Sequence, residues 1–115
     1  MIQINVRDII VSLAEMASPL FQQRVWIRPS TEWESSYVEC ISRLFDDSGL
    51  QDALRSGSVF GQEIDGLLRK IDELTDAIDF RRPEERIVAD PDFRSCSQIA
   101  ADILPFIMLK SGYEP

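Results

Sequence analysis

The stretch that most constrains the fold is residues 62–79, QEIDGLLRKIDELTDAID, in which every third or fourth residue is apolar. The apolar positions are Ile64, Leu67, Leu68, Ile71, Leu74 and Ile78. This spacing places them along one face of an α-helix and leaves the charged residues on the other faces. We therefore expect a helix over residues 62–79 that buries one face against the rest of the chain.

The same spacing predicts a first helix over residues 5–18. Asn5 is a suitable N-cap, because its side-chain oxygen can accept a hydrogen bond from the first turn. Pro19 is expected to end this helix or to restart the chain as a short helical turn through Gln23. The segment that follows, residues 24–28 (RVWIR), is expected to be a short strand or extended chain.

A second long helix is predicted between Trp33 and Asp46. Thr31 and Glu34 have the spacing of a capping box, and apolar residues follow at helical intervals, including Val38. Trp33 lies on the apolar stripe of this helix, so we expect its side chain in the core. A glycine at position 49 suits the left-handed conformation that ends many helices.

The last helix is predicted to begin at Asp90-Pro91, where an N-cap aspartate precedes a proline at the first helical position. Its apolar face continues to Phe106 and Ile107. Pro105 lacks a backbone N–H, so it is expected to kink or end the helix near Leu104. Residues 81–86 are expected to form a polar connector, and residues 50–56 could add one helical turn.

Apart from residues 24–28, no segment shows the sustained alternation of apolar and polar residues that a half-buried strand would have. A chain of 115 residues can bury one core without metal or disulfides. We therefore expect a single all-α domain spanning residues 1–115, a small bundle of four to five helices.

The charge of the chain restricts its partners. Twenty acidic residues against twelve basic ones give a net charge of −8, which repels nucleic acids and anionic lipids and attracts cationic proteins. No apolar run is long enough to cross a bilayer, and residues 1–13 lack the pattern of an export signal. These features predict a cytoplasmic protein that binds neither nucleic acid nor membrane.

The sequence offers little that could support catalysis. Histidine is absent, which removes the commonest general base and metal ligand. Cys40 and Cys96 lie in apolar-patterned segments and are expected to be buried and reduced. Glu73 and Asp76 form only half of the paired carboxylate motif that binds magnesium in helical nucleotide pyrophosphatases. We expect no catalytic residue, metal or cofactor, although a carboxylate-dependent enzyme remains a weaker alternative.

The candidate partner-binding residues are mainly aspartates of the helix predicted over residues 62–79. They lie within about 60° of arc and are interrupted only by Arg69. They are Asp65, Asp72, Asp76 and Asp79. Like charges at this spacing cost about 0.2–0.5 kcal/mol per pair, and such an uncompensated row often marks a functional surface. The alternative is a solvated face neutralised by Arg81, Arg82 and Arg86.

Three further residues are candidates for partner binding. Asp46 and Asp47 place two negative charges at the negative end of a predicted helix. Trp26 lies off the helical stripes, so it is expected to be more exposed than Trp33. It could cover the end of the bundle or serve as an anchor for another protein.

In the motifs RVWI, LFDD, GSVFGQE and DPDF, the chain resembles a family of small acidic bacterial proteins of uncharacterised activity. The matching positions are Arg24, Val25, Trp26, Ile27, Asp46, Asp47, Asp90 and Pro91. The chain departs from this pattern at RPSTEW, where a more acidic or aromatic loop is expected. The resemblance implies an immunity protein, since small acidic proteins of this type occur beside polymorphic or contact-dependent growth inhibition toxins.

The leading hypothesis is therefore an immunity protein that neutralises a cognate bacterial toxin. Its acidic surface would cover the cationic active site of that toxin, which we expect to be a nuclease. The alternative is a helical regulatory or scaffold module that binds proteins but has no toxin partner.

Overall fold

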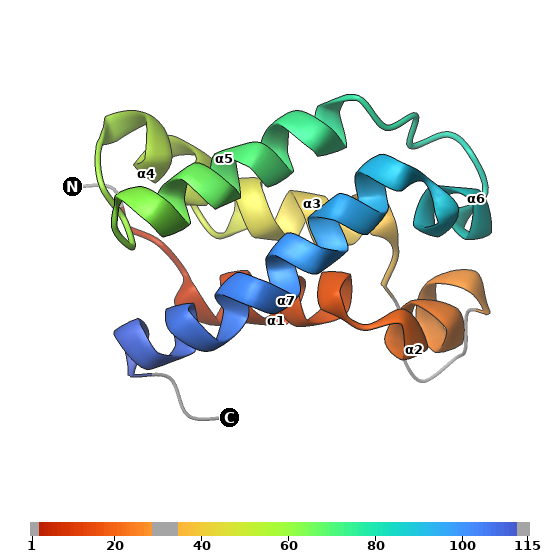
Figure 1. The fold of residues 1–115 in the computed structure, drawn as a ribbon, viewed down its shortest axis with the longest axis horizontal. Coiled ribbons are helices and arrows are strands. Elements are labelled where there is room, and N and C mark those ends of the chain that lie inside the picture. Colours follow the sequence, from red (N-terminus) through yellow and green to blue (C-terminus); the bar gives the residue numbers. More distant parts are fainter. Residues whose placement is uncertain (1–2, 29–34, 113–115) are drawn as a thin grey trace.

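The computed structural model describes residues 3–28 and 35–112, and all regular secondary structure in these ranges is helical. Figure 1 shows the long helix α7 (Pro91–Ser111) running diagonally across the molecule. It packs mainly against α1 (Val6–Ala17) and α5 (Gln62–Asp76). The predicted all-α class is confirmed. The described residues form seven α-helices, more than the four to five expected.

The N-terminal helices show why the count is higher. Asn5 caps α1 as predicted, accepting a 3.1 Å hydrogen bond from a backbone N–H of the first turn. After Ser18 the chain restarts as the short helix α2 (Pro19–Phe21) and widens into a π-helical segment, η1 (Gln22–Ile27). Residues 24–27 are thus helical, and the expectation of a strand or extended chain there is wrong.

The middle of the chain is also divided into shorter helices. Ser36 caps α3 (Tyr37–Ser42), which continues into a second π-helical segment, η2 (Arg43–Asp47). The helix α4 (Leu50–Ser56) follows, where the sequence allowed a single turn. The predicted capping box and helix start lie outside the described residues, namely Thr31, Glu34 and Trp33.

Gly49 joins η2 to α4 in the left-handed conformation predicted for it, with φ of 80°. A methyl group added here would lie 2.5 Å from the carbonyl oxygen of Gln3. Only glycine therefore permits this close approach of the N-terminal segment, which is also held by a 2.7 Å hydrogen bond from the Asn5 N–H to the Ser48 carbonyl.

The helix α5 ends at Asp76, three residues earlier than predicted. The following segment, expected to be a polar connector, contains the short helix α6 (Glu84–Ala89). This helix packs against η1 and α7, and Figure 1 places it at one end of the molecule.

Asp90 caps α7 as predicted, but the helix does not end near Leu104; it continues through Pro105 to Ser111. Pro105 and Ala101, the residue whose carbonyl loses its partner, are both exposed. Water can therefore replace the missing hydrogen bond. No helix in the described ranges has the length and hydropathy needed to span a membrane.

The buried side chains form one hydrophobic cluster. Within this cluster, the rings of Trp26, Tyr37 and Phe93 meet edge to face, with centroids 5.8–6.4 Å apart. Cys40 and Cys96 are buried and free, as predicted.

Two apolar residues that the helical spacing assigned to the core are exposed instead. Val38 of α3 is 45% exposed, and Phe106 of α7 is 59% exposed. Each lies beside a groove on the surface of the bundle.

Candidate functional site

The structure separates the four aspartates that the sequence placed on one edge. Asp65, Asp72 and Asp76 belong to α5, whereas Asp79 lies beyond its end. Asp65 is buried, Asp72 is half-buried, and Asp76 and Asp79 are exposed. The expected row of equivalent carboxylates is therefore not what the fold presents.

Asp65 is part of the protein interior. Its carboxylate accepts hydrogen bonds from the backbone N–H groups of Val59 and Phe60, at 2.9 and 2.8 Å. The hydroxyl of Ser58 lies 3.4 Å from the same carboxylate. Asp65 is only 2% exposed, so it closes the loop before α5 and has no free surface for a partner. Its assignment as a binding residue is corrected.

Asp72, by contrast, faces other acidic groups. Partial burial raises its pKa above the ordinary value, and the nearby charge of Asp76 raises it further. A hydrogen bond from Gln51 and the charge of Arg55 oppose this shift, while Asp46 adds to it. The charges of Asp46 in η2 and Asp76 in α5 both act on Asp72. We call these three residues the acidic seam.

The remaining candidate aspartates are not members of the acidic seam, although Asp79 lines the same surface groove as Asp76. Asp79 is paired with Arg81 at 3.1 Å, and hydrogen bonds from this arginine lower its pKa. Arg82 pairs with Asp90 instead, at 2.7 Å. Asp47 lies near the start of α1, beside a shallow depression. The alternative to partner binding was an acidic face neutralised by three arginines, and the structure shows one such contact, from Arg81 to Asp79.

An apolar groove of about 660 Å³ lies next to the acidic seam, between α3 and the C-terminal end of α5. We call it the α3–α5 groove. Val38 and Ile41 contribute apolar side chains from α3, and Asp76 lies in its lining. Phe80 also lines the groove and is 62% exposed. Phe80 is not among the candidate residues predicted from the sequence. Its only signal was an aromatic residue in a charged segment, outside any helical stripe.

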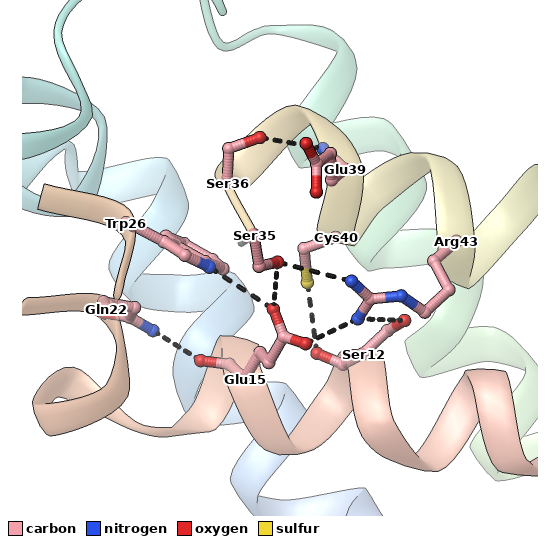
Figure 2. Close-up of polar contacts among 9 residues, drawn as sticks. All are labelled: Ser12, Glu15, Gln22, Trp26, Ser35, Ser36, Glu39, Cys40 and Arg43. Carbon is pink, nitrogen blue, oxygen red and sulfur yellow. Dashed lines mark hydrogen bonds and ion pairs between the residues drawn. The ribbon is translucent and has the colours of Figure 1, made fainter. Parts of the chain in front are cut away.

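The structure also corrects the assignment of Trp26 as a candidate binding residue. Trp26 is 2% exposed, so it cannot serve as a surface anchor. Figure 2 shows its indole Nε1–H pointing at the carboxylate of Glu15, to which it donates a 3.3 Å hydrogen bond. It lies in the core as part of the aromatic cluster. Trp33, which was predicted to be less exposed than Trp26, lies outside the described residues.

Glu15 collects three donors from three parts of the chain. Besides Trp26, the Ser35 hydroxyl and the Arg43 guanidinium each approach its carboxylate to 2.6 Å (Figure 2). Arg43 also reaches the hydroxyls of Ser12 and Ser35, at 3.5 and 3.3 Å. We call these residues the Glu15 network. Each of its charges has a partner, so it fixes α1, η1 and η2 to one another.

The described residues contain no group of three or more side chains arranged to hold a metal ion. Burial raises the pKa of the Cys40 thiol well above its ordinary range and that of Cys96 to about 12. At neutral pH both thiols are therefore protonated, which makes them weak nucleophiles.

No family model matches this chain, and neither does any curated protein or solved structure.

Proposed function

We propose that this protein is an immunity protein that binds and neutralises a basic bacterial toxin. The observation that carries the proposal is the α3–α5 groove, where exposed apolar side chains lie directly beside the acidic seam. Protein interfaces combine a central apolar anchor with surrounding polar contacts. The groove supplies the apolar part, and the seam supplies charge opposite to that of a nucleic-acid-binding toxin.

The toxin would contact this surface with lysines or arginines and with an apolar side chain. The seam carboxylates would pair with the basic residues that otherwise hold phosphate groups. Phe80 and Val38 would pack against the apolar side chain. The net charge of −8 would accelerate the encounter, and added salt would slow it.

The function is tested by expressing the toxin domain encoded beside this gene, with and without the protein, and by counting surviving cells. We expect growth arrest without the protein and full growth with it. If the neighbouring polypeptide is not toxic, or if the protein gives no protection, the immunity function is wrong. Binding without toxicity would instead support the regulatory or scaffold alternative.

The surface is tested by changing Asp46, Asp72 and Asp76 to asparagine together. Each lost charge pair costs about 1.5 kcal/mol or more, so losing all three should lower the affinity about a thousandfold or more. Phe80→Ala should also weaken binding by about 2 kcal/mol if this ring is an anchor. Calorimetry against the purified toxin domain measures both effects.

The matched control neutralises three exposed acidic residues elsewhere, namely Asp52, Glu63 and Glu85. It makes the same change in net charge but leaves the acidic seam intact. We expect it to slow association slightly and to leave the dissociation rate unchanged. Equal losses of affinity in both triple variants would show that only overall charge matters, and that the seam is not the interface.

A further inference from the structure

The last two turns of α7 carry an apolar surface that is separate from the acidic seam and the α3–α5 groove. Leu109 is 80% exposed and Phe106 is 59% exposed. At 100° per residue, Asp102, Phe106 and Leu109 fall within about 60° of arc. Lys110 borders this side of the helix. We call these four residues the α7 face.

A groove lies directly beside the α7 face. It has a volume of about 530 Å³ and runs between α7 and the N-terminal half of α5. Its apolar lining consists of Phe60, Ile64, Leu67, Ile103 and Phe106. At its rim, the Lys110 ammonium lies 3.6 Å from the position that a methyl group on Gly61 would take. The surface therefore combines projecting apolar side chains with an apolar hollow.

We propose that the α7 face is a homodimer interface in which the α7 helices of two copies pack antiparallel around a two-fold axis at Phe106. Residues 102 and 110 each lie four positions from Phe106, about 6 Å along the helix. Antiparallel packing thus places Asp102 of each copy beside Lys110 of the other. Leu109 then lies at the level of Ile103 in the second copy, where the apolar groove opens.

Charge complementarity favours a second copy of this chain over a different partner. A two-fold interface uses the same surface twice, so each charge must meet its opposite from within one patch. The α7 face meets this condition with Asp102 and Lys110, one of only two lysines in the chain. A strongly basic or acidic partner would leave one of these two charges against a like charge.

The charge pairing is tested by sedimentation velocity over a range of protein concentrations. We expect a concentration-dependent dimer in the unmodified protein. Asp102→Lys or Lys110→Asp alone should weaken it at least about tenfold, because each creates two like-charge contacts. The double variant D102K/K110D restores both pairs and should restore the dimer. A protein that stays monomeric, or a double variant as weak as the single ones, overturns the proposal.

The position of the axis is tested by disulfide trapping. In the proposed dimer, residue 106 of one copy faces residue 106 of the other, so Phe106→Cys should form a crosslinked dimer under mild oxidation. Leu20→Cys is the control, because Leu20 is 56% exposed on α2, away from the α7 face. Cys40 and Cys96 are both 0% exposed and should not react. If the two variants crosslink at the same rate, the proposed geometry is wrong. A dimer that survives every α7 substitution also overturns it.

Discussion

The Glu15 network and the acidic seam place carboxylates on helices in opposite surroundings. The Glu15 carboxylate is almost fully buried, and an arginine, a tryptophan and a serine donate to it. Asp72 of the seam is half-buried, and two of the charges that reach it are aspartates. The charge of Glu15 is neutralised within the fold, whereas that of the seam is available to another molecule. Burial and partners, more than the presence of a carboxylate, separate the two roles.

The strongest way to break this comparison is Glu15→Ala. It leaves Arg43 partly buried without its partner, and removing one member of a buried ion pair costs about 3–5 kcal/mol. Total stabilities of small domains are about 5–15 kcal/mol, so the variant should be close to unfolding at moderate urea concentrations. Urea unfolding followed by circular dichroism measures the loss.

Asp76→Ala is the matched control, because it removes an exposed carboxylate of the acidic seam. We expect its free energy of unfolding to stay within about 0.5 kcal/mol of the unmodified protein. If both variants lose similar stability, the two groups of carboxylates do not differ as the geometry indicates.

The local helical signals were readable from the sequence because they depend on neighbouring residues. The spacing in residues 62–79 predicts α5 to within three residues of its end, and Asn5 and Asp90 cap α1 and α7 as predicted. Gly49 likewise takes the left-handed conformation. Each of these features is decided by side chains only a few positions away.

The errors concern contacts between residues far apart in the sequence. Trp26 is buried because Tyr37 and Phe93 pack against it, and no local pattern reveals this cluster. Asp65 looked equivalent to Asp72 by helical spacing, but the preceding loop folds back onto its carboxylate. The difference in exposure among the aspartates of α5 is therefore a tertiary effect that helical spacing does not predict.

Asp65 sharpens the comparison. It belongs to α5, as Asp72 and Asp76 of the acidic seam do, but its carboxylate is buried and hydrogen-bonded like that of Glu15. Asp65→Ala leaves the buried N–H of Phe60 and the partly buried N–H of Val59 without an acceptor and should cost about 1–3 kcal/mol. Hydrogen exchange should become faster at Val59 and Phe60 in particular, because these residues donate to the carboxylate.

Asp65→Asn is the intermediate case, because its single side-chain oxygen can still accept one of the two hydrogen bonds. We expect about half the loss of the alanine variant. Unchanged exchange at both amides in the alanine variant would contradict the structural role of Asp65.

The smallest expected effect is a gain in stability from Asp72→Asn. Asp72 and Asp76 are four residues apart on α5, and such like-charge pairs cost about 0.2–0.5 kcal/mol. Removing one charge should raise the free energy of unfolding by about this amount at neutral pH. A loss of stability would show that the carboxylate of Asp72 is needed by the fold, which would place it with Glu15.

The pH dependence of this gain tests its origin. The raised pKa of Asp72 means that the folded protein binds a proton at this site more readily than the unfolded chain. The unmodified protein should therefore gain stability from this site as the pH falls from neutral, and the gain should be complete below the ordinary value of 3.8. There Asp72 is uncharged in both states and resembles asparagine, so the advantage of the variant should vanish. Glu84, whose pKa is also raised, and Asp79 and Asp90, whose pKa values are lowered, affect both proteins equally and cancel in the difference. Urea unfolding of both proteins at several pH values measures that difference, and a difference independent of pH would mean that electrostatic repulsion is not its cause.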